Sequence, residues 1–459
     1  MSTLVTTLAA PHLATLPVAR RIARYALGYS TTDTALVDKV RTCVFDCLAG
    51  ALLSRDLPWT RQAIDYAIAM GGTGTTLFAD ARTASCADAA FANATMAHGL
   101  VQEDMHAAAV AHIGVVVIPT LLALADSNRV SGKTFIDAVI AGYQVMARLG
   151  RALITREVAR TFRPTGLIGA IAGAAAGARL HGLTEDEAVS AIALAANTAS
   201  GLNEWPRTGG SEMFFHPGFA ARNAVTSLML AKLGAHCSES AIDGPGGLLA
   251  AYRAAPESGH WLDDFGGASE ILEVYHKPVP ACNYAQTPAQ AALAVARKLK
   301  TPVDAIRAIH VKSFPAAIEY PGCDYAGPFA SILQAKMSMQ FAIATALVSG
   351  TLAEESFRVL DDPHVARLCG MISFEVDAAI TRAFPPRQGA EVIVTLADGT
   401  RVASRLDDVV SLQPPAVRAR FHAAANRVLG GERTRQIESS IDALPTLADI
   451  NLMTRLLRA

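Results

Sequence analysis

Residues 166–182 read GLIGAIAGAAAGARLHG and consist almost entirely of glycine, alanine and short aliphatic side chains. Small side chains let neighbouring helices approach closely, so this segment predicts a central helix packed tightly against others. Arg179 and His181 interrupt its C-terminal end, which favours the core of a soluble domain over a membrane-spanning segment. We therefore expect a helical domain around it.

The surrounding residues repeat a helical pattern from about residue 33 to residue 251. Apolar residues recur at spacings of three and four, which is typical of amphipathic helices. Thr184 and Glu187 have the spacing of a capping box, which marks a helix start. The clearest of these helical segments are residues 35–53, 133–153 and 186–202. This half of the chain is predicted to be an all-helical bundle.

The pattern changes after residue 265. Residues 305–314, AIRAIHVKSF, alternate apolar and polar side chains like a half-buried strand, and residues 373–380 repeat the signal. Residues 391–406 are typical of a hairpin whose tight turn is Asp398-Gly399. Helical patterns at 334–350 and 363–372 predict helices on one face of these strands.

Helical patterns return at residues 417–431 and 447–457, and we expect them to pack back on the first domain. The prediction is a mainly α protein in which a large, discontinuous all-helical domain carries a smaller α+β lid domain. We place the helical domain at residues 1–268 and 411–459, and the lid at residues 269–410.

Composition narrows the class of protein. The 459 residues are 51% hydrophobic, enough for two cores, and 40 Lys+Arg balance 41 Asp+Glu without a basic block that would bind nucleic acid. The run at 113–125 contains Pro119 and is shorter than the roughly 20 residues a membrane helix needs. The first arginines follow the apolar N-terminal residues, the reverse of a secretory signal. We expect a cytoplasmic protein.

Seven cysteines without a CxxC pair predict neither a disulfide framework nor a structural zinc site. The chain has no GxxxxGK[ST] motif for nucleotide phosphates and no GxSxG motif for a serine nucleophile. We therefore predict no nucleotide cofactor.

The first candidate site is the segment 97–126, which places three histidines and two acids before an uncharged apolar run. Proton-carrying groups beside a buried helix indicate a cleft with perturbed acids and bases. The histidine spacings of eight and six do not match HExxH, so we predict no metal. His106, close to Asp104, is either an acid/base group or a surface histidine. The titratable residues are His98, Glu103, Asp104, His106 and His112.

Two further clusters can complete a site. In residues 203–225, Arg207 precedes His216, and Pro217-Gly218 is predicted to open a helix whose N–H groups face an anion. A histidine that only caps that helix is the alternative. Near the domain change, Lys277 is an anion clamp, a general base if desolvated, or a solvated hinge lysine.

The order of these motifs resembles the MmgE/PrpD family along almost the whole chain. The resemblance implies a helical domain with an α+β lid, usually in a homodimer, acting without a cofactor on small polycarboxylates. Members include 2-methylcitrate dehydratase, cis-aconitate decarboxylase and iminodisuccinate epimerase. The motifs are HIGVVVIPTLLALAD (112–126), AGYQVMARLG (141–150), FRPTG (162–166), FFHPGFAARNA (214–224), DGPGG (243–247), KPVPAC (277–282) and the DGT turn (398–400).

The sequence departs from the lyase members of this family. Where they tend to read HxxDxDDT, this chain keeps His98 and Asp104 but has Val101, Glu103 and Met105. Where they often carry FHP and a lysine, it has Arg163 and Met213, whereas Lys277, His112 and His216 match. The branch that it most resembles is iminodisuccinate epimerase.

We therefore hypothesise a cofactor-independent epimerase that inverts the carbon beside a carboxylate of an amino-polycarboxylate such as iminodisuccinate. Such inversion requires two opposed proton carriers and cations that hold the carbanionic carboxylate. His106 and Lys277, one from each domain, are the expected pair across the cleft, with Tyr143 as a third donor. The expected substrate-binding residues are Asp104, His112, Arg148, Arg163, Arg207 and His216.

Two alternatives remain open. One is a dehydratase or decarboxylase of a citrate-like or aconitate-like acid, and the other is an inactive relative that only binds carboxylates. The residues lost at positions 101 and 105 count against the first.

Overall fold

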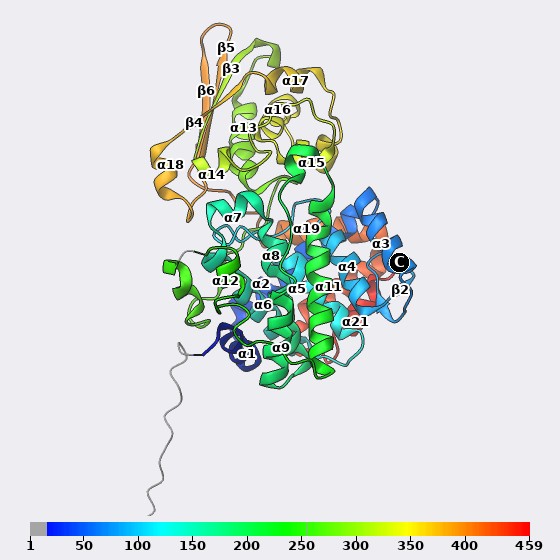
Figure 1. The fold of residues 1–459 in the computed structure, drawn as a ribbon. Helices are drawn as coiled ribbons and strands as arrows, with labels where there is room; N and C mark the ends of the chain where they lie inside the picture. The colour runs from blue at the N-terminus through cyan, green and yellow to red at the C-terminus, as the bar shows by residue number, and fades with distance from the viewer. Residues whose placement is uncertain (1–15, 255) are drawn as a thin grey trace, which may run out of the picture.

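The structure is a computed structural model that describes residues 16–254 and 256–459. Residues 1–15, on which part of the N-terminal interpretation rests, lie outside the described residues. Figure 1 shows a large helical part with a smaller α+β part at one end, as the sequence predicts. The helical part contains α1 (Val18–Gly28), α2 (Thr34–Ser54), α3 (Pro58–Ala69), α4 (Cys86–Ala97), α5 (Gly114–Ala125), α6 (Gly132–Leu153), α7 (Arg156–Thr161), α8 (Pro164–His181), α9 (Glu185–Ala196), α10 (Trp205–Thr208), α11 (Glu212–Lys232) and α12 (Leu248–Ala251), with α19 (Pro414–Leu429), α20 (Gly431–Asp442) and α21 (Asn451–Thr454) from the end of the chain.

Helix α8 lies at the centre of the helical part, and its residues 164–178 are all buried. A Cβ atom at Gly173 would lie 2.7 Å from the Cβ atom of Ala224 on α11. A Cβ atom at Gly177 would lie 2.8 Å from side-chain atoms of Leu124 on α5 and Leu228 on α11. The absent side chains therefore let these helices approach, and the predicted central helix is confirmed.

The α+β part is built on a four-stranded sheet of order β4-β3-β5-β6. Strand β3 pairs parallel with β4 and antiparallel with β5, and β5 and β6 form the predicted hairpin. Gly399 has a φ of 84° in the turn, a conformation that glycine adopts without strain. The elements are α13 (Gln286–Lys298), β3 (Ile306–Ser313), α14 (Pro315–Ile318), α15 (Ile332–Met337), α16 (Met339–Ser349), α17 (Pro363–Cys369), β4 (Ile372–Val376), α18 (Ala378–Ala383), β5 (Ala390–Leu396) and β6 (Arg401–Leu406).

The C-terminal helices return to the helical part, where the rings of Phe421 on α19 and Phe45 on α2 lie 5.2 Å apart. The buried apolar side chains form two clusters, one that joins residues 18–274 with 417–457 and one centred on the sheet. The boundaries at residues 268/269 and 410/411 stay a prediction. Among the described residues, no helix combines the length and apolarity that crossing a bilayer requires.

Three local predictions are corrected. Residues 334–350 form two helices, because Ser338 is extended and its side chain accepts a hydrogen bond from the Phe341 N–H, which starts α16. Helix α11 begins at Glu212, so Pro217 lies inside it and His216 does not cap a helix start. Strands β1 (Thr75–Thr76) and β2 (Thr83–Ala84) form a small hairpin within the region predicted to be helical.

Candidate active site

The connection between α4 and α5 brings two histidines to one carboxylate. His98 follows α4, Glu103 lies in the connection, and His112 precedes α5. The Nδ1 atoms of His98 and His112 lie 2.5 and 2.9 Å from the same oxygen, Oε1 of Glu103. All three side chains are buried, so the carboxylate contacts both rings where bulk water is excluded.

The protonation of this cluster follows from its burial. Burial lowers the pKa of His98, and burial together with the Lys277 charge lowers the pKa of His112 well below its usual value. Burial alone would raise the pKa of Glu103, but the two imidazoles hold it well below its usual range. At neutral pH both rings are therefore neutral. His98 donates its Nδ1–H to Glu103, and His112 donates its Nδ1–H to the Asp104 carbonyl at 3.2 Å with Glu103 beside it, which leaves a lone pair on each Nε2.

His112 lines a small cavity between the helical part and the lid, the inner cavity, of about 20 Å³. Among the described residues, none forms a hydrogen bond with its Nε2 atom. Val101 and Val110 also line the cavity and have φ angles of 58° and 51°, a strained conformation for β-branched residues that is typical of functional sites. The remaining lining residues are Met105, Arg163, Met213, Cys282, Asn283, Tyr284, Tyr320 and Met337.

Arg163 supplies a positive charge to the inner cavity. Its side chain is buried between α7 and α8, where one terminal nitrogen donates a 3.0 Å hydrogen bond to His98 Nε2. Its guanidinium carbon lies 5.7 Å from the ring centre of Trp205, and its Nε atom has no hydrogen-bond partner. No described carboxylate forms an ion pair with it. A buried guanidinium without a counter-ion is suited to bind an anion.

Lys277 is the second buried cation. Its Nζ atom donates to the carbonyl oxygens of Val101 and Ala281 at 2.9 and 3.2 Å, and burial lowers its pKa to about 8. The lysine does not line the inner cavity, but it lies behind the cavity wall formed by Val101. When His98 and His112 are neutral, the positive charges of Arg163 and Lys277 exceed the negative charge of Glu103 by one.

His106 lies in a different network. Its Nε2 atom is 3.0 Å from Glu270, and its Nδ1 atom accepts a 3.2 Å hydrogen bond from the Ala109 N–H. Glu270 also pairs with Arg148 and Arg151 at 3.0 Å each. Both ring nitrogens of His106 are therefore occupied, and the structure does not bring His106 and Lys277 to a shared cavity. Arg148 likewise lies in this network and not in the inner cavity.

The other expected site residues separate into two groups. Asp104 accepts hydrogen bonds from the Tyr143 hydroxyl and from the Gly114 N–H at the start of α5, so this pair holds the helix and does not line the cavity. Arg207 is exposed on α10 and lies 3.7 Å from Glu204. His216 is buried behind Arg163, and burial lowers its pKa to about 3.

Sequence reasoning named Glu103 among the titratable groups of the first candidate site but not among the expected catalytic or binding residues. It gave no role to the lid residues Cys282, Tyr284 and Tyr320. Cys282 lies in the KPVPAC motif, but nothing in the sequence indicates that its side chain lines the inner cavity. The Cys282 and Cys323 sulfurs are 3.6 Å apart. This contact and the Lys277 and Arg163 charges lower the pKa of Cys282 to about 7.

The donor atoms of His98, Glu103 and His112 lie within 4.8 Å of one another, a spacing that a metal ion could bridge. Their contacts to Glu103 already use the two Nδ1 atoms, and the positive charges of Arg163 and Lys277 oppose a bound cation. We therefore interpret the carboxylate as the internal partner of both rings.

The positions at which the chain departs from the lyase pattern meet in space. Val101, Met105, Arg163 and Met213, which come from three motifs, all line the inner cavity. The Met213 sulfur lies 3.0 Å from His98 Nε2. Their side chains make most of the wall opposite the lid apolar, with Arg163 as its charged group.

The chain combines a helical part with an α+β part, and a small cavity lined by a buried arginine lies between them. Comparison with known families makes this specific. The MmgE/PrpD N-terminal domain matches residues 20–258, and the MmgE/PrpD C-terminal domain matches residues 279–444. The chain therefore belongs to the MmgE/PrpD family.

Curated relatives of the chain are enzymes. It is 26% identical to cis-aconitate decarboxylase of Mus musculus over 81% of this chain and 78% of the relative. It is 22% identical to cis-aconitate decarboxylase of Aspergillus terreus over 96% of each chain. The enzyme of the same name from Homo sapiens is 26% identical over 81% of this chain and 79% of the relative. These names favour a lyase over the epimerase that the sequence suggests.

Proposed function

We propose that the protein is a cofactor-independent lyase that acts on a small aconitate-like or citrate-like polycarboxylate in the inner cavity. The observation that carries this proposal is the pairing of two groups on one cavity wall. Arg163 is a buried cation without a carboxylate partner among the described residues, and His112 is a neutral imidazole backed by Glu103. The first binds a carboxylate and the second moves a proton at the adjacent carbon.

The charge balance supports the anion. One substrate carboxylate neutralises the excess positive charge of Arg163 and Lys277 over Glu103. The guanidinium forms charge-assisted hydrogen bonds with it, which are about twice as strong as neutral ones. When the carbon beside this carboxylate gains electron density in the transition state, the same cations stabilise the negative charge that spreads onto the carboxylate oxygens.

His112 supplies the proton transfer. Its Nε2 lone pair takes a proton from the substrate, and Glu103 stabilises the imidazolium that forms, because the carboxylate lies 2.9 Å from Nδ1. In the elimination of water, the imidazolium gives this proton to the hydroxide that leaves the adjacent carbon, so that water departs. In decarboxylation, His112 takes its proton from solvent instead, and the imidazolium gives it to the carbon as the bond to the departing carbon dioxide breaks. The names of the relatives favour decarboxylation.

An epimerase is the second candidate, and one observation favours it. Cys282 from the lid lines the same cavity as His112 from the helical part, and its pKa is lowered to about 7. Two proton carriers on one cavity are the minimum that inversion beside a carboxylate requires. In this mechanism His112 and Cys282 are the two proton carriers, in place of the pair His106 and Lys277 that the sequence suggested.

One assay distinguishes the candidates. The purified protein is incubated in deuterated water with cis-aconitate, with citrate and with each enantiomer of iminodisuccinate, and products are followed by proton NMR and optical rotation. A lyase changes the carbon skeleton or the double bonds. An epimerase keeps the composition, removes the optical rotation because inversion at one of the two equivalent carbons gives the meso form, and introduces deuterium beside the carboxylate.

Three results are informative. Product from cis-aconitate or citrate supports the lyase, and inversion of iminodisuccinate with deuterium uptake supports the epimerase. Tight binding by calorimetry without turnover of any of these compounds would reject both and favour a carboxylate-binding protein. The homodimer implied by the family stays a prediction, which light scattering of the purified protein would test.

A further inference from the structure

Two cysteines of the lid lie in contact, although 41 residues separate them along the chain. Cys282 precedes α13, and Cys323 lies in the connection between α14 and α15. The Cys282 N–H donates a 2.8 Å hydrogen bond to the Lys336 carbonyl on α15, and the Cys323 carbonyl accepts a 2.9 Å bond from the Met339 N–H at the start of α16. Both backbones are therefore held at the junction of α15 and α16, where their sulfurs are 3.6 Å apart.

The two thiols have different surroundings. Cys282 lines the inner cavity together with Arg163, whereas Cys323 is fully buried in the lid and is not part of the cavity lining. The contact with Cys323 and the charges of Lys277 and Arg163 lower the pKa of Cys282 to about 7, and burial raises the pKa of Cys323. The thiolate is the nucleophilic form of cysteine, so Cys282 is the thiol that reacts first with an oxidant.

The inner cavity has room only for a small oxidant. Its volume is about 20 Å³, whereas one water needs about 10–15 Å³ by the same measure. Hydrogen peroxide, with two oxygen atoms, is of the size that this volume admits beside Cys282, and oxidised glutathione is far too large. Arg163 lines the same cavity, and its positive charge stabilises both the thiolate and the hydroxide that a peroxide releases.

We propose that Cys282 and Cys323 are a redox-active pair, which hydrogen peroxide converts to a disulfide that weakens binding of the anion in the inner cavity. The Cys282 thiolate attacks one peroxide oxygen, so that an S–O bond forms, the O–O bond breaks, and hydroxide leaves and takes up the proton that Cys282 had released. The Cys323 thiol then attacks the sulfenic sulfur, the S–S bond replaces the S–O bond, and the hydroxyl group leaves as water with the thiol proton. The two sulfurs are oxidised, and the peroxide is reduced to two molecules of water.

A disulfide changes the shape of the inner cavity. Its S–S bond is about 2.0 Å long, so the two sulfurs must approach from 3.6 Å. Tyr284 follows Cys282 by two residues, and Tyr320 precedes Cys323 by three. The two tyrosine rings lie 5.3 Å apart, and both line the inner cavity. Closing the S–S bond therefore moves two rings and one sulfur of a cavity that has little free volume.

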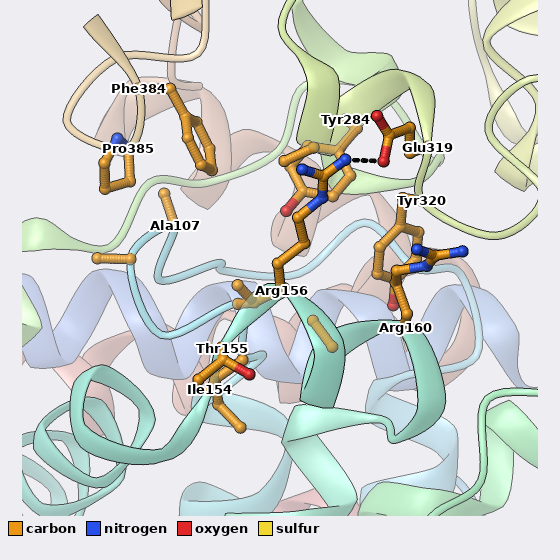
Figure 2. Close-up of a pocket in the computed structure, with 14 residues that line it drawn as sticks. Ala107, Ile154, Thr155, Arg156, Arg160, Tyr284, Glu319, Tyr320, Phe384 and Pro385 are labelled. Atoms are coloured by element: carbon orange, nitrogen blue, oxygen red, sulfur yellow. Dashed lines mark ion pairs between the residues drawn. The ribbon is translucent and has the colours of Figure 1, made fainter. Parts of the chain in front are cut away.

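The same two rings also line a second pocket, the outer pocket, of about 160 Å³ (Figure 2). Arg156 and Arg160 of α7 belong to the lining of this pocket as well. A shift of the rings is therefore felt on the surface that the lid presents to the helical part. The expected effect on anion binding rests on the proposed function at Arg163, whereas formation of the disulfide does not.

Peptide mapping by mass spectrometry tests the disulfide. The reduced full-length protein, which has seven cysteines, is treated with hydrogen peroxide, its remaining thiols are alkylated, and its peptides are identified. We expect a crosslink between residues 282 and 323 that dithiothreitol removes. The absence of this crosslink would overturn the proposal, whether peroxide leaves the protein unchanged, adds oxygen to residue 282 alone or oxidises only the methionines of the cavity.

Calorimetry with tricarballylate tests the effect on the inner cavity. The Kd of the oxidised protein should exceed that of the reduced protein by about tenfold or more, as for the loss of one hydrogen bond to a charged group, and dithiothreitol should restore it. A crosslinked protein with an unchanged Kd would show that the pair does not control the cavity. If the reduced protein does not bind tricarballylate, the anion site at Arg163 is wrong, and the crosslink alone decides whether the redox pair exists.

Two variants assign the effect to the pair. Cys323→Ala should bind tricarballylate as the reduced wild type does and should form no crosslink. Without the second thiol, excess peroxide carries Cys282 on to the sulfinic acid, which dithiothreitol does not reduce, so the rise in Kd should become irreversible. Cys369→Ala changes another buried lid cysteine, on α17, and should keep the crosslink and its reversal. A rise in Kd that dithiothreitol still reverses in Cys323→Ala would overturn the role of the pair.

Discussion

Arg163 donates a 3.0 Å hydrogen bond to Nε2 of His98, and the other nitrogen of that ring contacts Glu103. The same Glu103 oxygen lies 2.9 Å from His112 Nδ1. The cation proposed to bind the substrate and the imidazole proposed to move the proton are therefore linked through one buried carboxylate. A substitution of Arg163 should therefore affect His112, and a substitution of His112 should affect Arg163.

Glu103→Gln should lower kcat by about 100-fold or more with a smaller change in KM, because a neutral amide does not stabilise the His112 imidazolium as the carboxylate does. Steady-state kinetics across pH 5–9 checks this. Because Glu103 acts through His112, its loss should also shift the dependence of kcat on pH that His112 determines. The matched control is Glu270→Gln, a buried carboxylate outside both pockets. An unchanged kcat in Glu103→Gln would contradict the role assigned to His112.

Arg163→Met should lower kcat/KM by about 100-fold, since one charge-assisted contact to a buried carboxylate contributes roughly 2–3 kcal/mol. Arg163→Lys keeps the charge but loses the planar fork, so we expect an intermediate loss. Arg207→Met changes an exposed arginine on α10 and should leave kcat/KM within twofold, a limit expected for surface positions. Equal losses in the 163 and 207 variants would remove Arg163 from the site.

His106→Gln separates a structural role from a catalytic one. The ring bridges Glu270 and the Ala109 N–H inside a buried network, so its loss should lower the free energy of unfolding by about 1–3 kcal/mol. The activity per folded molecule should stay within threefold, an effect of under about 1 kcal/mol on the barrier. Urea unfolding and kinetics on the same preparation check both, and a large loss of kcat in a stable variant would restore His106 to the mechanism.

His216 should make stability pH-dependent. Burial lowers its pKa to about 3 in the folded protein, whereas the unfolded value is near ~6.5. Between these values the unfolded chain binds a proton that the folded protein does not. Stability therefore falls as pH drops below ~6.5, by up to ~1.4 kcal/mol per pH unit from this group.

The variant His216→Gln removes this contribution. The difference in unfolding free energy between wild type and variant should shift by about 2 kcal/mol in favour of the variant between pH 7 and pH 5. Urea titrations at both pH values measure it. A constant difference would mean that the ring is not buried in its neutral form.

Gly173→Ala tests the packing of α8. A Cβ atom there would lie 2.7 Å from Ala224 Cβ, so the variant should lose about 1–3 kcal/mol of stability although alanine favours the helix. Gly28→Ala is the matched control, because a Cβ atom at the end of α1 meets nothing within 4 Å. Thermal unfolding followed by circular dichroism compares the two, and equal melting temperatures would contradict the close approach of α8 and α11.

Local patterns in the sequence predicted the central helix, the capping box at Thr184 and the β5–β6 hairpin, because these depend on residues near one another in the chain. The motif succession also indicated the family. It pointed to several buried groups around the cavity, such as His112 and Arg163, but it could not distinguish them from Asp104 and Tyr143, which are equally buried and serve to hold α5.

The sequence by itself determined the two-part architecture and the types of side chain available, since periodicity and composition are written along the chain. Only the tertiary structure decided which of those side chains share a cavity. Val101, Arg163, Met213 and Cys282 meet there because packing of α8, α11 and the lid brings distant segments within a few ångströms. Their placement depends on long-range packing that no spacing along the chain records.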